Sequence, residues 1–150
     1  MDHFLRGAWA FSRSISCRLT STVTRVVGTA SWLPLTPAPD ERAALEQVED
    51  GLLALPGAAP GGTLAPLPVT AKYSWHWPDG GGAALVRFPD GRPFVADVDF
   101  LAAPCAVAHA CAPDAYEGHF ERDGDGAFVV VWTVTGPRKD YVSVTRFTRQ

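Results

Sequence analysis

The chain has 150 residues, of which 47% are hydrophobic and 19% charged, a composition that is typical of one globular domain and excludes disordered and fibrous classes. Thirteen basic and sixteen acidic side chains give a net charge of −3, without the basic excess of nucleic-acid-binding proteins. No apolar run reaches the roughly 18 residues of a membrane-spanning helix, and the first residues lack a signal-peptide pattern. We therefore expect residues 1–150 to form one cytoplasmic domain with neither nucleic-acid nor membrane partners.

The three cysteines, Cys17, Cys105 and Cys111, are odd in number and lack the paired CxxC spacing of zinc sites. Neither a disulfide framework nor a metal site is predicted, and we expect the thiols to be reduced. Arginine outnumbers lysine by eleven to two, a bias that we expect from a GC-rich bacterial genome.

The first predicted strand starts near Trp9. From Phe11 to Thr20 the odd-numbered side chains are apolar and the even-numbered ones are polar, and Arg13 alone interrupts the apolar series. Alternation with a period of two predicts a strand that turns one face towards a core.

Residues 40–53 combine helical and strand features. Asp40 stands at an N-cap position, and apolar residues follow it at helical spacing. The helically spaced residues are Ala44, Leu45, Val48 and Leu52. A family resemblance described below favours a strand instead, and we adopt the strand.

Residues 54–70 are rich in glycine and proline and have no periodicity, so we expect a long surface loop or a lid over a barrel mouth.

Six further strands are predicted downstream, because alternating or β-branched stretches are separated by turns rich in Gly, Pro and Asp. Short turns favour pairing between sequence neighbours, and closing such a meander removes its exposed edges. We predict an all-β fold, a single antiparallel up-and-down β-barrel of about 8–10 strands. The six stretches are Ala71–Trp77, Ala83–Phe88, Phe94–Phe100, Ala115–Glu121, Ala127–Thr135 and Tyr141–Thr148.

Gly7-Ala8-Trp9 opens the first strand, and Arg146 and Arg149 lie in the last one. In this arrangement the chain resembles the calycin superfamily, which includes the lipocalins and fatty-acid-binding proteins. The resemblance implies a calycin-like barrel in which Trp9 plugs one end and an arginine of the final strand stacks on its ring.

Other segments carry a narrower resemblance. They are Glu49 with Gly51, Tyr73-Ser74-Trp75, Phe88–Phe94, His109-Ala110-Cys111 followed by Asp114 and Tyr116, and Trp132 leading to Gly136-Pro137-Arg138-Lys139-Asp140-Tyr141. In these segments the chain resembles an uncharacterised bacterial family, a domain-of-unknown-function family with a calycin-like barrel. The resemblance implies this fold and supplies no reaction.

The stretch from His109 to Tyr116 gathers the chemistry-bearing side chains of the C-terminal half. On an extended strand His109 and Cys111 face one side, and beyond Pro113 the side chains of Asp114 and Tyr116 share a face. A thiolate–imidazole pair is one interpretation of Cys111. The alternative is a packed Cys111 beside a histidine whose hydrogen bonds are structural, and we prefer it because buried polar groups are usually satisfied in this way.

Aromatic and cationic residues supply candidate ligand contacts. Tyr73, Trp75 and Trp77 project from one strand face, which is typical of a core, and Trp132 is expected in the core or the cavity wall. If the 136–141 turn rims the barrel mouth, Arg138 and Lys139 are suited to hold an anionic group. A solvated surface turn is the alternative.

We predict a barrel that binds a small hydrophobic or amphipathic, anion-bearing molecule, without a cofactor. An alternative from another class is a cofactor-free isomerase, cyclase or lyase of secondary metabolism, with His109 or Asp114 as base and Tyr116 or Tyr141 as acid. A second alternative is haem binding through a histidine. A homodimer is compatible with the sequence. The candidate ligand contacts are Trp75, Trp77, Trp132, Arg138, Lys139, Tyr141 and Arg146.

Overall fold

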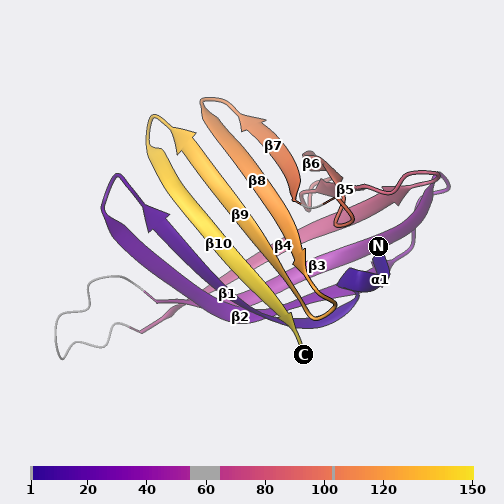
Figure 1. Ribbon diagram of the computed structural model, residues 1–150, viewed down its shortest axis with the longest axis horizontal. Helices are drawn as coiled ribbons and strands as arrows, with labels where there is room; N and C mark the ends of the chain where they lie inside the picture. The colour runs from indigo at the N-terminus through magenta and orange to yellow at the C-terminus, as the bar shows by residue number, and fades with distance from the viewer. Residues whose placement is uncertain (1, 55–64, 103) are drawn as a thin grey trace.

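The structure, a computed structural model, describes residues 2–54, 65–102 and 104–150. In this part of the chain one short helix precedes ten β-strands (Figure 1). Their bounds are α1 Asp2–Leu5, β1 Gly7–Cys17, β2 Thr22–Leu35, β3 Glu41–Ala54, β4 Leu67–Pro78, β5 Ala84–Arg87, β6 Pro93–Val98, β7 Cys105–Cys111, β8 Asp114–Asp123, β9 Ala127–Gly136 and β10 Lys139–Arg149. No helix among the described residues is long and apolar enough to cross a membrane.

The ten strands form one antiparallel sheet in the order β6-β5-β4-β3-β2-β1-β10-β9-β8-β7. Strand β1 pairs with β2 on one side and with β10 on the other, so the two ends of the chain meet. The sheet curls until β7 returns beside β6 (Figure 1). This is the predicted all-β up-and-down barrel, nearly closed, and the resemblance to a calycin-type fold is confirmed.

The two edge strands, β6 and β7, have no backbone ladder between them. Cys105 bridges this seam: its Sγ accepts a hydrogen bond from the Asp99 backbone nitrogen at 3.3 Å and donates to the Asp97 carbonyl oxygen at 3.4 Å. All three cysteines are free. Cys105, for which no role is predicted from the sequence, therefore joins the two edge strands as a buried thiol.

Residues 41–53 form a strand, as the family resemblance implies, although local spacing favours a helix. Strand β3 pairs along its length with both β2 and β4, and these long-range ladders outweigh weak helical propensity. The predicted 54–70 loop is too long, because β3 includes Ala54 and β4 starts at Leu67. Residues 55–64 of that loop lie outside the described residues.

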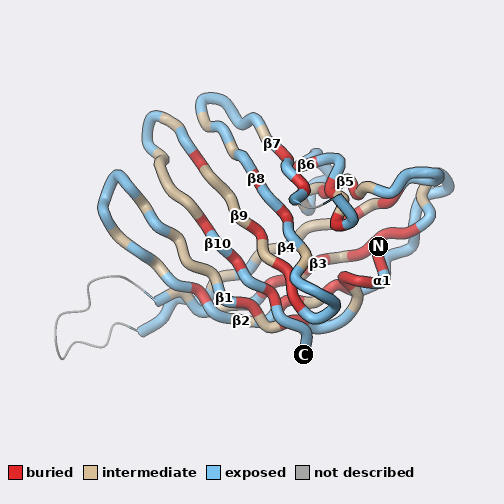
Figure 2. The backbone as a smooth tube through the Cα atoms, viewed as in Figure 1, coloured by how far each residue is buried: buried red, intermediate tan, exposed pale blue. Residues whose placement is uncertain are grey.

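The barrel end near α1 is filled with aromatic side chains. Trp9 is fully buried there, and its ring centroid lies 5.0 Å from Phe128 and 6.3 Å from Trp32. Its indole nitrogen donates to the Leu5 carbonyl oxygen at 2.8 Å, so α1 caps the ring. Buried residues gather at this end, whereas the hairpin tips at the opposite end are exposed (Figure 2).

Arg149, rather than Arg146, makes the contact that the calycin resemblance implies. Its guanidinium lies 4.3 Å from the Trp9 ring centroid and donates to the carbonyl oxygens of Phe4 and Arg6. Arg146 has the opposite parity on β10, points outward and pairs with Asp123 at 2.7 Å.

This difference predicts unequal effects for the two arginines. Arg149→Ala removes a cation–π contact and two charged hydrogen bonds, and we expect the free energy of unfolding to fall by about 2 kcal/mol. Arg146→Ala removes an exposed ion pair and is expected to change it by less than about 0.5 kcal/mol. Urea unfolding of both variants measures this, and equal losses would contradict the assignment of Arg149 as the arginine that stacks on Trp9.

Candidate functional site

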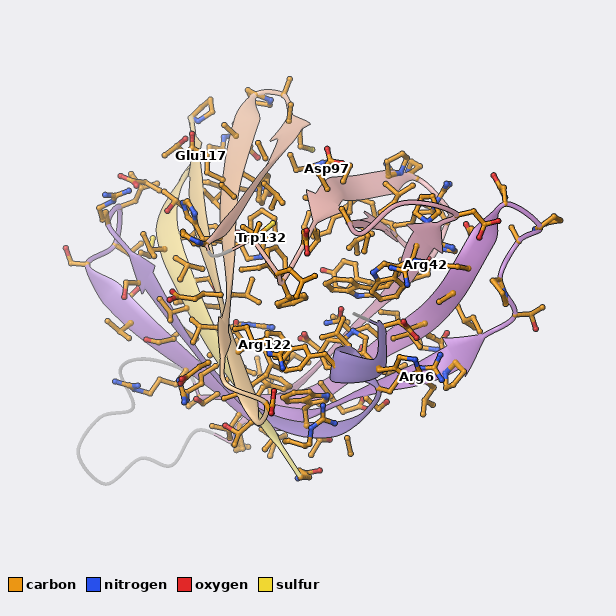
Figure 3. All side chains as sticks on the ribbon, turned by 45° about the vertical axis from the view of Figure 1, so that its right-hand side comes forward. Arg6, Arg42, Asp97, Glu117, Arg122 and Trp132 are labelled. Atoms are coloured by element: carbon orange, nitrogen blue, oxygen red, sulfur yellow. The ribbon has the colours of Figure 1, made fainter. Side chains whose placement is uncertain are left out.

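A cavity of about 470 Å³ lies inside the barrel, and aromatic side chains form much of its wall. Strands from all around the barrel contribute to its wall, because the inward positions of each strand alternate with outward ones. Figure 3 shows the Trp132 side chain on the inner side of β8 and β9. The lining residues are Arg13, Ile15, Trp32, Gln47, Glu49, Ala71, Tyr73, Trp75, Val86, Phe94, Val95, Tyr116, Phe120, Phe128, Val130, Trp132, Val134, Tyr141, Ser143, Thr145 and Phe147.

A hydrogen-bonded network crosses one side of this apolar cavity. The Arg13 guanidinium donates to the Glu49 carboxylate at 2.8 Å and to the Thr145 hydroxyl at 2.7 Å. The other Glu49 oxygen accepts from Gln47 at 2.8 Å, and the Gln47 carbonyl oxygen accepts from the Trp75 indole at 2.7 Å. The members of this network come from β1, β3, β4 and β10, so the network links these strands across the cavity wall.

Arg13 and Glu49 are the only charged residues among the lining residues that the structure describes. The Arg13 side chain is 24% exposed and that of Glu49 only 6%. Of the two charged side chains, that of Arg13 is therefore the more exposed.

Two tyrosines of the cavity have raised pKa values. Burial raises the pKa of Tyr73 above its ordinary value, and the nearby Glu49 charge adds to this effect while Arg13 opposes it. Burial also raises the pKa of Tyr141, with a further contribution from Tyr116. Both phenols therefore remain protonated and able to donate at neutral pH.

These shifts predict a loss of stability in alkali. Because the pKa is higher in the folded than in the unfolded chain, the stabilisation is complete below the unfolded value of about 10 and is lost as pH rises through the folded value. Urea unfolding as a function of pH should show stability falling above about pH 10. The Tyr73→Phe/Tyr141→Phe variant should show a shallower fall, and an unchanged slope would contradict the assignment.

The structure places the predicted ligand contacts in three settings. Trp75, Trp132 and Tyr141 line the cavity. Trp77 is fully buried behind Trp75, with ring centroids 6.1 Å apart, and does not reach the cavity. Arg146 points outward, as described above. We therefore drop Trp77 and Arg146 as ligand contacts, because neither side chain can reach a molecule in the cavity.

The cations of the β9–β10 turn lie away from the cavity wall. Arg138 is exposed on the turn, with no partner among the described residues. Lys139 lies 2.8 Å from the Asp114 carboxylate and donates to the Tyr116 hydroxyl at 3.0 Å. These two hydrogen bonds, the one to Asp114 first, raise the pKa of Lys139 above its ordinary value. Lys139 thus holds Tyr116 at the end of the cavity opposite α1.

The proposed catalytic trio is only partly assembled. Asp114 and Tyr116 meet through Lys139, whereas His109 makes no hydrogen bond in the described structure. The His109 ring packs instead against Phe94, Phe88 and Tyr116, at centroid distances of 5.2, 5.9 and 5.8 Å. His109 faces inward in an aromatic cluster, and Cys111, on the same face of β7, is exposed at the strand end.

The histidine ligation of haem has no counterpart in the described cavity wall, because no histidine is among the lining residues. Within the described residues no group of three or more His, Cys, Asp and Glu side chains could hold a metal ion.

The residues of this network, Arg13, Gln47 and Glu49, were not predicted as site residues from the sequence. Arg13 carried a usable signal, because a cation that interrupts the apolar face of a strand must point into the barrel. Glu49 stands 36 positions away on β3, and nothing local indicated that the two would pair.

Comparison with known proteins supports the fold and names the family. An S-type phycobiliprotein lyase from Guillardia theta superposes with a TM-score of 0.67 at 8% identity, covering 99% of this chain and 90% of the lyase. A redesigned beta barrel bound to DFHBI gives a TM-score of 0.47 at 13% identity, covering 99% of this chain and 97% of the design. No curated protein matches the sequence. A family of unknown function, DUF6314, matches residues 5–149, and the chain therefore belongs to this family.

Proposed function

We propose that the protein binds a small molecule with a flat, largely apolar framework inside the barrel. The observation that carries this proposal is the 470 Å³ cavity with its aromatic wall, a volume within the range of about 300–1,000 Å³ that is usual for small-molecule sites. Side chains such as Trp75, Trp132 and Phe94 offer ring faces and edges that favour a conjugated or aromatic ligand.

The ligand carries an oxygen acceptor or an anionic group. Arg13 lines the cavity and supports this part of the proposal, because its side chain is more exposed than that of Glu49, which balances its charge. The protonated phenols of Tyr73 and Tyr141 supply two further donors. The anion is thus expected at Arg13 inside the barrel, rather than at Arg138 or Lys139 as the sequence pattern suggests.

Two fluorescent probes test the proposal. We expect 8-anilino-1-naphthalenesulfonate, an anion, to bind at least about tenfold more tightly than the uncharged N-phenyl-1-naphthylamine, a difference of about 1.4 kcal/mol. Ala71→Trp fills the cavity and is expected to abolish binding of both probes. Thr70→Trp places the same side chain on the exposed face of β4 and should leave binding intact.

The two variants also separate cavity binding from adsorption to the surface. Equal binding by Ala71→Trp and Thr70→Trp would overturn the cavity as the site. A preference for the uncharged probe would overturn the anionic group while leaving the cavity in place.

An isomerase, cyclase or lyase is the second candidate function, and the structure favours some of its predicted catalytic residues over others. Tyr116 lines the cavity and accepts a hydrogen bond from Lys139, so it is the better-placed acid, whereas His109 lacks the oriented hydrogen bond that a base requires. Turnover that survives Tyr116→Phe would contradict this alternative.

A further inference from the structure

Three side chains form a hydrogen-bonded chain on the outer face of the barrel. Ser74 and His76 stand two residues apart on β4 and share its outward face. The Ser74 hydroxyl oxygen lies 2.9 Å from His76 Nε2, and His76 Nδ1 lies 3.0 Å from the Glu41 carboxylate. Glu41 lies at the start of β3, 35 residues from His76 in sequence, so the sequence did not indicate that the two side chains would pair.

The carboxylate fixes the role of each nitrogen of His76. Burial favours the neutral acid, but hydrogen bonds from His76 and from the Ala38 backbone nitrogen hold the pKa of Glu41 below its ordinary value. An ionised carboxylate can only accept, so His76 Nδ1 donates to it, and neutral His76 keeps its Nε2 lone pair for the Ser74 hydroxyl. Hydroxyl, imidazole and carboxylate thus stand in the order that activates a serine as a nucleophile.

A groove of about 520 Å³ surrounds this chain of side chains and gives a substrate access to it. Ser74, His76, Glu41 and Arg87 all line the groove. Arg87 stands directly across from Ser74 in the β4–β5 ladder. Its Nη1 donates to the Gly91 carbonyl oxygen at 3.3 Å, and its Nε is buried without a hydrogen-bond partner in the described structure. A cation next to a nucleophile favours the negative charge that develops on a carbonyl oxygen.

We propose that Ser74, His76 and Glu41 form an acyl-transfer site that hydrolyses small carboxylic esters in this groove, apart from the ligand cavity. Ser74 Oγ forms a bond to the ester carbonyl carbon while its proton passes to His76 Nε2, and the carbonyl electron pair moves to the oxygen beside Arg87. The carbon–alkoxy bond then breaks, and the alcohol leaves with the proton from His76. Water attacks the acylated Ser74, gives a proton to His76 and releases the acid, and that proton returns to Ser74 Oγ.

Covalent labelling with a fluorophosphonate tests the nucleophile. We expect one adduct per chain on Ser74, detected by intact mass and peptide mapping. Ser74→Ala and His76→Ala should lose the adduct, and Glu41→Gln should slow labelling at least tenfold. Ser12→Ala removes an exposed serine of β1 and should label as the parent protein does. An unlabelled parent protein, or unchanged labelling of Ser74 in His76→Ala, would overturn the proposal.

A burst assay separates a serine nucleophile from simple imidazole catalysis. With p-nitrophenyl acetate we expect one equivalent of nitrophenolate in a rapid phase, lost in Ser74→Ala. A burst that persists in Ser74→Ala would contradict the mechanism. Ala71→Trp should retain labelling and burst, so that a failure of the groove and a failure of the cavity are distinguished.

Discussion

Gly28→Ala is expected to lower the free energy of unfolding by about 3 kcal/mol or to prevent folding altogether. Gly28 on β2 faces Gly51 on β3, and a Cβ at Gly28 would lie 2.1 Å from the Asp50 carbonyl oxygen and 2.6 Å from the Gly51 Cα. Both atoms are backbone, so relief of the collision requires the two strands to move apart. Urea unfolding followed by tryptophan fluorescence measures the loss.

Gly126→Ala is the matched control for this prediction. A Cβ there meets nothing within 4 Å, and Gly126 is not among the glycines with positive φ. We expect a change of less than about 0.5 kcal/mol. Similar losses in the two variants would contradict a close approach of β2 and β3 at Gly28.

Breaking the ion pair between Arg13 and Glu49 is expected to cause a second large loss in the free energy of unfolding. Glu49→Ala leaves the Arg13 guanidinium uncompensated inside the barrel, and we expect a loss of about 3 kcal/mol. Replacing both partners with apolar residues, as in Arg13→Met/Glu49→Leu, should restore stability to within about 1 kcal/mol of the parent protein, because no unpaired charge remains.

Stability and binding respond differently in these variants. If the pair exists for ligand recognition, the double variant should fold well yet lose its preference for 8-anilino-1-naphthalenesulfonate over N-phenyl-1-naphthylamine. Equal stability losses in the single and double variants would show that the charge pair is not the source of the effect.

The barrel was predictable because its determinants are local. Period-two alternation from Phe11 onward and the short glycine-rich turns indicate strands that pair with their neighbours, and that pairing produces a meander. Strand β3 was decided by resemblance, since its own spacing suits a helix and only the ladders to β2 and β4 hold it extended. The seam at Cys105 depends on contacts that no local pattern encodes.

The site was less predictable because strand parity and distant pairing decide it. Arg149 shares the parity of inward Thr145 and Phe147 on β10 and stacks on Trp9, whereas Arg146 has the opposite parity and lies outside. The carboxylate partners of Arg13 and of His76 both lie on β3, more than thirty residues away in sequence, and come close only when the sheet forms.

Ligand binding in the cavity can be followed through the indole N–H resonances of the five tryptophans during titration with 8-anilino-1-naphthalenesulfonate. We expect the largest shifts for Trp75 and Trp132, which line the cavity, and the smallest for Trp9, whose indole nitrogen is hydrogen-bonded to the Leu5 carbonyl oxygen. Resonances of Trp75 and Trp132 that stay unmoved at saturating probe would contradict binding in the cavity.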